Sequence, residues 1–565
     1  MLKCKNKKEV CSLKVVIACL NSKYIHASLS PWCLAAGVDA FSANDFEACV
    51  MESTINKDVS EFAEKIIEQK PFAVGLSCYI WNITKTLELC KIIKNNINVP
   101  IILGGPEVSY RAKDVLENYS FVDFVLSGEG EESFPLLLDA IYNNGDLSTV
   151  CGLSYRKSNG IVSIPEKECK GTPPSPYSDK YFESLNGRIT YLETSRGCPY
   201  RCAFCLSGRC SPLRFFDMEY VKESIIKLAN SGTKTVKFVD RTFNANAIRA
   251  NEIISFILEN HKQTIPDGVC FHFEIAGDII AEETFNLLNK APKGLFQLEI
   301  GMQSFNEETL KTINRKTNTE KLIKNIKRLV SFNNMHIHID LIAGLTGEDI
   351  KSFERSFNIG YSLKAHMLQM GFLKLLYGAD MRENSEKYPC EFTEEPPYEV
   401  TKTPWLSEDE IVSLKKCEDA LERLYNSGRF LMTLEYLIDD VGFEPFNLFY
   451  GFGNFVDGNK MNLSDYALKV YEFFCDKCDK DILIEKLHCD LLSCSSALQI
   501  PDIFKTNHPL YRRAKSHFTN NTTDKIKVAV LPKSEKIFVV NQSGEKNLHG
   551  RYPCKFYGFS DFRNL

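Results

Sequence analysis

The chain has 565 residues, a length that corresponds to roughly three to five domains of ordinary size. Hydrophobic residues make up 44% and charged residues 25% of it, the composition of a folded globular protein rather than of a disordered or fibrous one. The 68 basic and 73 acidic side chains leave a formal charge of -5, so composition does not favour nucleic-acid binding. No run of about 18 apolar residues predicts a membrane span, and no signal-peptide pattern is recognisable, so we expect a cytoplasmic protein whose 21 cysteines serve as reduced thiols or as ligands of metals and clusters.

Short β-branched runs alternate with amphipathic stretches from about residue 13 to residue 144. This pattern predicts an open, doubly wound parallel α/β sheet. The expected strands cover residues 15–19, 46–51, 72–78, 101–103 and 121–126. Ligands of such sheets bind beyond the carboxyl ends of the strands. We assign residues 1–147 to this domain and residues 148–188, which include a Pro- and Ser-containing stretch, to a linker.

A second alternating series predicts a partial (β/α)6 barrel over residues 189–377, with its active site at the carboxyl ends of the strands. The expected strands cover residues 190–194, 235–240, 270–276, 296–302, 336–342 and 367–376. Beyond this series the alternation stops, and Ser407 with Glu410 forms a capping-box pattern. We therefore expect a mostly helical C-terminal domain over residues 378–565, with two apolar runs, 527–531 and 537–540, that suit a hairpin.

Three cysteines follow the first strand of the second series at close spacing. Cys198, Cys202 and Cys205 form a CxxxCxxC pattern in the segment TSRGCPYRCAFC. Three thiolates at this spacing can ligate three irons of a [4Fe-4S] cluster and leave the fourth iron open to a small ligand. A closed structural metal site would need a fourth ligand, for which Cys210 is near enough in sequence.

At these residues the sequence resembles the radical SAM superfamily, whose cluster loop has an aromatic residue, here Phe204, just before the last cysteine. The resemblance implies reductive cleavage of S-adenosylmethionine (SAM) to a 5'-deoxyadenosyl radical. It also implies SAM-binding roles for Phe204 and for residues that match the oxygen-independent coproporphyrinogen oxidase type of barrel, namely Glu274, Gln303, Arg315 and Asp340. These residue types suit the task, because carboxylates bind hydroxyl and ammonium groups and arginine binds a carboxylate with two hydrogen bonds. Taken singly, Glu274 and Asp340 have an alternative role as caps of the following helices.

The N-terminal sheet resembles the cobalamin-binding domain of B12-binding radical SAM proteins. Ser77 at one strand end and the pair Gly104 and Gly105 at the next match the small residues that admit the nucleotide tail of cobalamin. The match extends through LGGPEVS and SGEGEESF, which contains Glu129. The resemblance therefore implies cobalamin as a further cofactor. His26 lies near the position of a cobalt-ligating histidine, but the usual acidic partner and glycine are missing, so it is either a cobalt ligand or a hydrogen-bonding loop residue.

The segment from residue 378 onward resembles the uncharacterised C-terminal domain of one bacterial branch of B12-binding radical SAM proteins. It contains a CxxC pair and three further metal-ligating side chains, which together suggest a second metal or cluster site. These residues are Cys475, Cys478, His488, Cys489 and Cys494. Alternatively, the cysteines belong to an apolar helix face.

These resemblances imply a cobalamin-dependent radical SAM enzyme that modifies an unactivated carbon, with methylation as the leading reaction. They also imply anaerobic work and a low-potential electron donor such as flavodoxin or ferredoxin. Three alternatives stay open. These are a cyclase or redox enzyme of the tetrapyrrole type, an RNA methylthiotransferase with a further cluster on Cys19, Cys49 and Cys78, and a cobalamin or SAM sensor without turnover. The sequence does not identify the substrate or the oligomeric state.

Overall fold

The computed structural model describes residues 13–209, 212–458, 461–494, 499–520 and 522–562. The chain divides into two compact units, and each unit contains several segments of the chain. The first unit consists of Met1–Ile275, Ala281–Ala291 and Lys374–Val400, and the second of Ala276–Ile280, Pro292–Leu373 and Thr401–Leu565. Within the described ranges, no helix is both long and apolar enough to cross a membrane.

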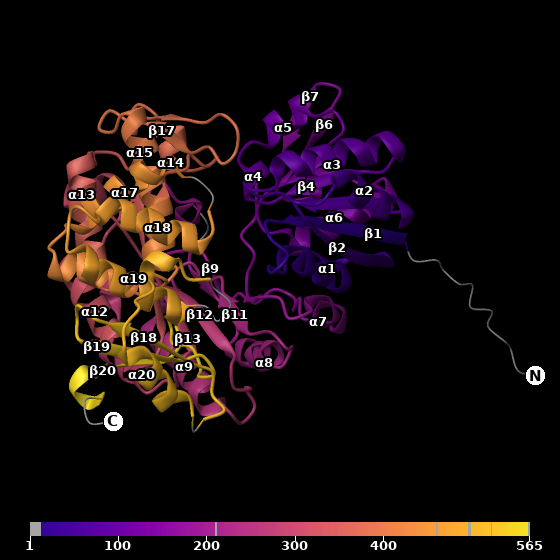
Figure 1. Cartoon of the computed structure of the whole chain (residues 1–565). Helices are drawn as coiled ribbons and strands as arrows, with labels where there is room; N and C mark the ends of the chain where they lie inside the picture. The colour runs from indigo at the N-terminus through magenta and orange to yellow at the C-terminus, as the bar shows by residue number, and fades with distance from the viewer. Residues whose placement is uncertain (1–12, 210–211, 459–460, 495–498, 521, 563–565) are drawn as a thin grey trace, which may run out of the picture. The chain divides into compact units, whose positions relative to one another are not determined.

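The first unit begins with a seven-stranded sheet in the order β2-β1-β3-β4-β5-β6-β7 (Figure 1). The first five strands pair in parallel, which confirms the predicted sheet. Their bounds are Leu13–Asn21 for β1, Phe46–Thr54 for β2, Ala73–Ser77 for β3, Ile101–Gly104 for β4 and Phe124–Leu126 for β5.

Helices cover both faces of this sheet because its central strands are apolar at successive positions. In β1, Val16 and Ala18 belong to the core under α2 and α3, whereas Val15 and Ile17 belong to the core under α1 and α6. Alternate side chains of a strand point to opposite faces, so one apolar run fills both cores. The helices are α1 (Ser30–Phe41), α2 (Val59–Glu68), α3 (Ile83–Asn96), α4 (Pro106–Ser109), α5 (Ala112–Asn118) and α6 (Gly130–Asn143).

Two antiparallel strands extend the sheet past the expected end of the N-terminal domain. β6 (Leu153–Lys157) pairs with β5, and β7 (Gly160–Ser163) pairs with β6. The interpretation of residues 148–188 as a linker is therefore wrong for this part, and the same segment also forms helix α7 (Asp179–Leu185). The signal that sequence analysis missed is the Ser-Asn-Gly turn before β7, which is typical of a hairpin.

The first unit also contains the first three strands of the second alternating series. β8 (Thr190–Leu192), β11 (Thr235–Phe238) and β12 (Cys270–Ile275) pair in parallel in that order. The short strands β9 (Ser195–Arg196) and β10 (Arg214–Phe215) form an antiparallel pair. The helices of this part are α8 (Met218–Ala229), α9 (Ala247–Asn260) and α10 (Glu282–Asn289).

The second unit contains the remaining strands of that series. β13 (Phe296–Gln303), β14 (His336–Ala343) and β15 (Met367–Phe372) pair in parallel in that order. Helices α11 (Glu307–Thr312), α12 (Thr319–Ser331) and α13 (Ile350–Ser362) lie between these strands in sequence. All six strands expected from the alternation are therefore present.

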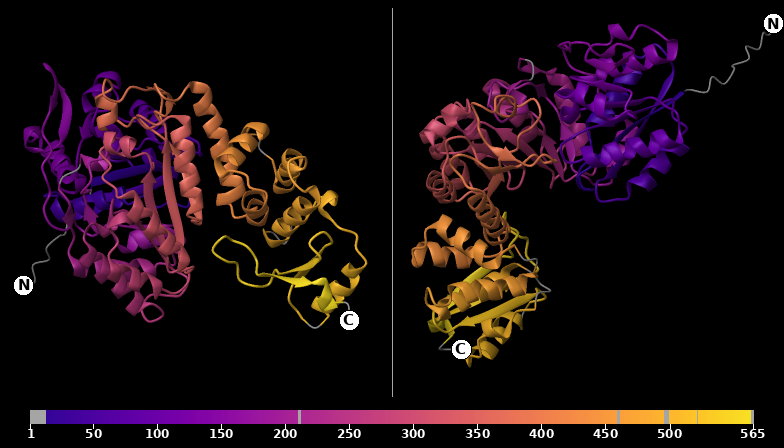
Figure 2. Two further views of the ribbon diagram at one scale, coloured as in Figure 1. Left: turned by 90° about the vertical axis from the view of Figure 1, so that its left-hand side faces the viewer. Right: turned by 90° about the horizontal axis from the view of Figure 1, so that it is seen from above.

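The C-terminal part of the second unit is helical and ends in a small sheet (Figure 2). The capping box of Ser407 and Glu410 begins α15, as predicted. β18 (Ile526–Leu531) and β19 (Lys536–Asn541) pair antiparallel, which confirms the hairpin, and β20 (Cys554–Gly558) adds a third strand. One face of this sheet packs against α19 and the other against α20. The helices are α15 (Glu408–Leu421), α16 (Leu431–Glu435), α17 (Pro445–Val456), α18 (Leu463–Phe474), α19 (Lys480–Cys494) and α20 (Leu510–Thr519).

The chain returns to the first unit over Lys374–Val400. This segment carries helix α14 (Asp380–Glu383) and strand β16 (Glu391–Phe392), which pairs with β17 (Val400–Lys402). Its Tyr398, only 2% exposed, donates a hydrogen bond of 2.5 Å to the carboxylate of Glu107 next to α4 residues of the N-terminal sheet domain. Arg111 binds the same carboxylate at 2.7 Å. The return segment is therefore built into the first unit by buried polar contacts.

Candidate active site

A cavity of about 600 Å³ opens at the carboxyl ends of the parallel strands in the first unit. This volume lies within the usual range of small-molecule sites, about 300–1,000 Å³. The five residues that the cobalamin-domain resemblance singled out all line it, namely His26, Ser77, Gly104, Gly105 and Glu129. Residues from the second alternating series also line it, among them Tyr191, Glu193, Arg196 and Arg241. The cavity therefore belongs both to the N-terminal sheet and to the segment that precedes the cysteine loop.

Gly105 allows the backbone to pass close to the end of β3. Its φ angle is +106°, and a Cβ atom at this position would lie 2.5 Å from the carbonyl oxygen of Cys78. Gly104 has more room, since its Cβ would lie 3.4 Å from the carbonyl oxygen of Leu126. Small side chains thus keep this wall of the cavity open, as a corrinoid tail would require.

Two aromatic residues stack at the same end of the cavity. The rings of Tyr79 and Trp81 are 4.4 Å apart and nearly parallel, and both residues line the cavity. The Tyr79 hydroxyl donates to Ser30 at 2.9 Å, and Ser30 donates to Ser77 at 3.1 Å. The pair offers a flat apolar surface beside polar groups, and Trp81 is 47% exposed.

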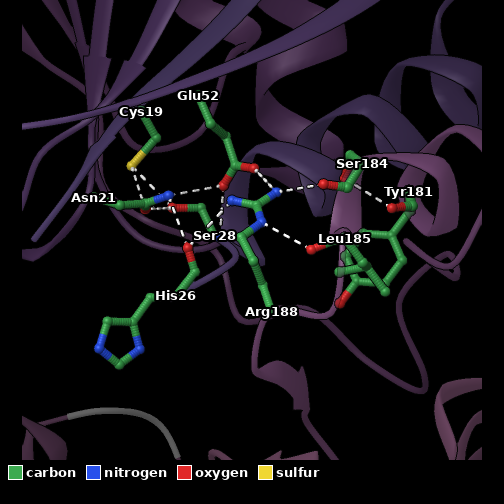
Figure 3. Close-up of polar contacts among 9 residues, drawn as sticks. All are labelled: Cys19, Asn21, His26, Ser28, Glu52, Tyr181, Ser184, Leu185 and Arg188. Carbon is green, nitrogen blue, oxygen red and sulfur yellow. Dashed lines mark hydrogen bonds and ion pairs between the residues drawn. The ribbon is translucent and has the colours of Figure 1, made fainter. Parts of the chain in front are cut away.

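A buried polar network holds the loop that carries His26 (Figure 3). The carboxylate of Glu52 accepts hydrogen bonds from the Asn21 side chain at 3.1 Å and from the Ser28 backbone N–H at 2.6 Å. The guanidinium of Arg188 binds the same carboxylate at 2.7 Å and the carbonyl oxygen of His26 at 3.3 Å. Side chains from β1, β2 and the segment before β8 thus fix the shape of this loop.

The imidazole of His26 is oriented by a phenol rather than by the usual carboxylate. Its Nδ1 atom lies 2.6 Å from the hydroxyl oxygen of Tyr191 on β8. Burial, together with the charges of Lys23 and Lys237, lowers the pKa of His26, so the ring is neutral at pH 7. The structure therefore shows His26 in the hydrogen-bonding role, and its role as a cobalt ligand stays a prediction.

Arg196 lies at the centre of a cluster of carboxylates beside the cavity. Its guanidinium contacts Glu131 at 2.5 Å and Glu193 at 2.9 Å, and it also pairs with Glu129. Arg214 binds Glu129 at 2.7 Å. Burial opposes ionisation of Glu129, but the hydrogen bond from Arg214 and the charge of Arg196 outweigh it and lower its pKa. Sequence analysis missed Arg196 because its partners Glu129 and Glu131 are distant in sequence.

The loop after β9 carries the three predicted cluster ligands. Cys202 is buried, and Cys198 and Cys205 are half-buried. The Sγ atom of Cys198 lies 3.5 Å from the hydroxyl oxygen of Thr242, and the Cys205 backbone N–H donates to the Cys202 carbonyl at 3.1 Å. Phe204 is half-buried in the same turn. Three thiols on one tight loop suit a [4Fe-4S] cluster with an open iron, whereas Cys210 lies outside the described residues.

Asp240, at the end of β11, holds the chain just before the cysteine loop. Its carboxyl group accepts hydrogen bonds from the Thr194 backbone N–H at 3.0 Å and the Thr194 hydroxyl at 2.7 Å, and it also contacts the Ser195 hydroxyl. Burial raises the pKa of Asp240 to about 6. Sequence analysis did not identify this residue, which sets the position of the two residues before Arg196.

The first predicted SAM-binding acid, Glu274, lies on β12 in the first unit. Its carboxylate lies 3.4 Å from the Lys237 ammonium group on β11. The helix-cap alternative is wrong both for Glu274 and for Asp340. Ala276 precedes the turn after β12, and Asp349 caps the helix after β14.

The other predicted SAM-binding residues meet in the second unit at one end of β13 and β14. The Arg315 guanidinium donates to the carbonyl oxygen of Gly301 at 2.8 Å, and Gly301 is the strand partner of Asp340. Gln303 ends β13 with a φ angle of +70°, and its amide nitrogen folds back beside Gly301. The structure thus brings Gln303, Arg315 and Asp340 together.

Two further polar residues on these strands were missed by the sequence analysis. Glu299, His338 and Asp340 offer ligand atoms that all lie within 4.8 Å of one another, and His338 Nε2 is 3.0 Å from Asp340 Oδ1. The signal was the period of two along β13 and β14, which puts Glu299 on the face of Gln303 and His338 on the face of Asp340.

The cysteines of the proposed second metal site make separate contacts. Three of the thiols donate to backbone carbonyls, from Cys475 to Glu472, from Cys478 to Phe474 and from Cys494 to Arg429. Cys489 packs in the core between α19 and the small sheet, as the apolar-face alternative expects. Burial lowers the pKa of the neighbouring His488 to about 4. A second metal site stays a prediction.

Family models match three parts of the chain in order. A B12 binding domain matches residues 15–138, the radical SAM superfamily matches residues 192–358, and a protein of unknown function (DUF4080) matches residues 386–549. The first match contains the cavity residues of the N-terminal sheet. The second begins on β8 and includes the cysteine loop.

Curated relatives and solved structures share this organisation. The chain is 28% identical over 313 residues to 2-(S-pantetheinyl)-carbapenam-3-carboxylate methyltransferase of Streptantibioticus cattleyicolor, and 29% identical over 313 residues to the cobalamin-dependent radical SAM methyltransferase TokK of Streptomyces tokunonensis. Each alignment covers 52% of this chain and 45% of the relative, so the chain spans less than half of their length. The structure of the cobalamin-dependent S-adenosylmethionine radical enzyme OxsB has a similar fold, with a TM-score of 0.61, 14% identity and coverage of 84% of this chain and 78% of that one.

Proposed function

This chain belongs to the B12-binding radical SAM proteins that carry a DUF4080 domain, and on that basis we propose that it is a cobalamin-dependent radical SAM methyltransferase acting on an unactivated carbon. One observation carries the proposal. A single cavity is lined by strand ends of the B12-binding domain and by Glu193 and Arg196, which lead into the loop of Cys198. Bound cobalamin would supply a methyl group, and the cluster with SAM would supply the radical that activates the substrate carbon.

The side chains of the protein bind and orient these groups. The thiolates of Cys198, Cys202 and Cys205 would hold three irons, and Thr242 would donate a hydrogen bond to the first thiolate. Gly105 and Ser77 line the wall along which the corrinoid tail would pass. In the second unit, the residues that would hold SAM are Gln303, Arg315 and Asp340, and in the first unit Glu274.

The proposed reaction requires electrons and the exclusion of oxygen. The protein would receive electrons from a low-potential donor of the flavodoxin or ferredoxin type in the cytoplasm of an anaerobic cell. The methyl acceptor is an unidentified substrate, which would bind between the groups held by the cavity and by the cysteine loop.

The thiols of the N-terminal sheet argue against the methylthiotransferase alternative. Cys19 is 2% exposed, and burial raises its pKa to about 12. Cys78 is fully buried and donates a hydrogen bond to the carbonyl oxygen of Leu76. Such thiols resist the deprotonation that iron binding requires. The cyclase alternative differs from methylation in product mass, and the sensor alternative differs in forming no 5'-deoxyadenosine.

The test begins with anaerobic purification from cells supplied with cobalamin, followed by cluster reconstitution and measurement of iron, sulfide and corrin. We expect one corrin and one [4Fe-4S] cluster per chain, and release of 5'-deoxyadenosine and S-adenosylhomocysteine from SAM after reduction. A triple Cys198→Ser, Cys202→Ser, Cys205→Ser variant should lose the iron, whereas Cys151→Ser, at a half-buried cysteine elsewhere in the first unit, should retain it. A cluster without corrin, after cobalamin was offered in excess, would contradict the proposal.

A further inference from the structure

Arginines at the two ends of β8 bind the two loops that flank the cavity. Arg188 precedes the strand and binds Glu52, which holds the loop of His26. Arg196 follows the strand and binds Glu129 and Glu131, which lie on the opposite loop between β5 and α6. The side chains of Arg188 and Arg196 are only 7% and 19% exposed. Both loops of the cavity are therefore tied to one strand of the radical SAM region.

Arg196 has the more consequential position because Gly197 alone separates it from Cys198. Its guanidinium holds Glu129 and Glu131, and the backbone of those two residues forms part of the cavity wall. The same ion pairs thus determine where the wall lies and where the cysteine loop begins.

The backbone on the other side of Arg196 has little freedom to absorb a displacement. Asp240 binds Thr194 and Ser195 through three hydrogen bonds. Ser195 and Arg196 also pair with β10 as strand β9. A shift of the Arg196 side chain therefore passes to Gly197, which has a φ of +90°, and to the cysteine that follows.

We propose that Arg196 couples the corrinoid cavity to the cysteine loop, so that a bound corrinoid and a bound iron–sulfur cluster strengthen each other's retention. This inference rests on the proposed function. A corrinoid that fixes the wall at Glu129 and Glu131 also fixes Arg196 and hence Cys198. A cluster that fixes Cys198 holds the wall in turn. Because linkage is reciprocal, the factor by which each group tightens the other is the same.

The experiment measures binding of hydroxocobalamin to the full chain by absorbance titration, with the cluster reconstituted and after its removal by a chelator. Couplings of this kind are typically about 5- to 150-fold, so we expect the wild-type Kd to be at least about 5-fold lower when the cluster is present. Arg196→Gln should bring the ratio of the two Kd values close to 1, and Arg196→Lys should give an intermediate ratio. Arg209→Gln is the matched control, because Arg209 follows the same cysteine loop but pairs with Glu383 at the surface.

A second measurement follows the reciprocal effect. The half-time of iron loss to a chelator should lengthen when hydroxocobalamin is bound to the wild-type chain, and it should not lengthen in Arg196→Gln. If Arg196→Gln does not fold by circular dichroism, Glu131→Gln removes a contact of the same guanidinium from the other side and should lower the ratio. Equal Kd values with and without the cluster in the wild type would overturn the coupling alone. Absence of corrinoid binding in both forms would overturn the proposed function and the coupling together.

Discussion

Replacing Arg188 with methionine (Arg188→Met) removes the cation from the network under the His26 loop. Arg188 donates to the Glu52 carboxylate at 2.7 Å and to the carbonyl oxygens of Leu185, His26 and Ser184 at 3.2, 3.3 and 2.9 Å. Methionine fills a similar space but donates no hydrogen bond. The variant therefore leaves Glu52 with two hydrogen bonds from neutral donors and without its cation.

The magnitude follows from burial. The side chains of Arg188 and Glu52 are 7% and 10% exposed, so water cannot replace the lost partner. Removing one member of a buried ion pair typically costs about 3–5 kcal/mol of unfolding free energy. For a large domain, 1 kcal/mol shifts Tm by about 2 °C. We therefore expect the transition of the first unit to fall by about 6–10 °C.

Differential scanning calorimetry of the full chain, with cofactors removed, measures this shift. The control is Lys85→Met, which breaks the pair with Glu88 on α3, where both side chains are close to half exposed. Such a surface pair contributes at most about 1 kcal/mol. The double variant Arg188→Met, Glu52→Leu removes both charges and should be more stable than Arg188→Met alone, because no buried carboxylate is left without its cation.

Two results would refute this reasoning. A shift for Arg188→Met no larger than that of Lys85→Met would show that the buried pair stabilises the unit no more than a surface pair. A double variant whose loss equals the sum of the two single losses would show that Arg188 and Glu52 act independently.

Three further predictions concern other parts of the chain. Gly105→Ala places a methyl group 2.5 Å from the Cys78 carbonyl at a positive φ and should weaken hydroxocobalamin binding about tenfold or more, whereas Gly232→Ala, also at positive φ but with open space around it, should leave the affinity unchanged in the same titration. Burial raises the pKa of Glu348 from 4.5 to about 7, so the stability that the protonated group contributes is fully present below pH 4.5 and is lost as the pH rises through 7; the Tm of wild type relative to Glu348→Gln should fall over this window, by the equivalent of about 3 kcal/mol, and a constant difference would contradict it. Asp490→Asn weakens a fully buried carboxylate's contact with Arg551 and should destabilise the second unit by about 3–5 kcal/mol in calorimetry, while Asp502→Asn at an exposed pair should have no measurable effect.

The parts of the site that depend on local pattern could be predicted from the sequence. The spacing of Cys198, Cys202 and Cys205 is a local property, and so are the glycines after β4, because a tight strand-to-helix turn selects them. Strands buried on both faces read as apolar runs, which is why the five parallel strands of the N-terminal sheet were found.

Contacts that depend on the folded chain could not be predicted in this way. Arg196 meets Glu129 and Glu131 across more than sixty residues of sequence, and no local pattern records such a pairing. The same holds for Tyr191, which takes the place of the missing acidic partner of His26. The hairpin of β6 and β7 was overlooked for a different reason, because only the first residues of β6 are buried and its exposed part resembles a loop.

The return of the chain to the first unit has a consequence for the modular architecture of this family. The region matched by the DUF4080 model begins at residue 386, yet the first unit extends to Val400. A chain cut at the family boundary would lack Tyr398, and Glu107, whose pKa burial already raises, would keep Arg111 as its charged partner but lose the phenol. The start of the C-terminal region is thus structurally a part of the N-terminal half. The two regions share a physical seam, so deletion or exchange of the C-terminal region at its sequence boundary would damage the half that remains.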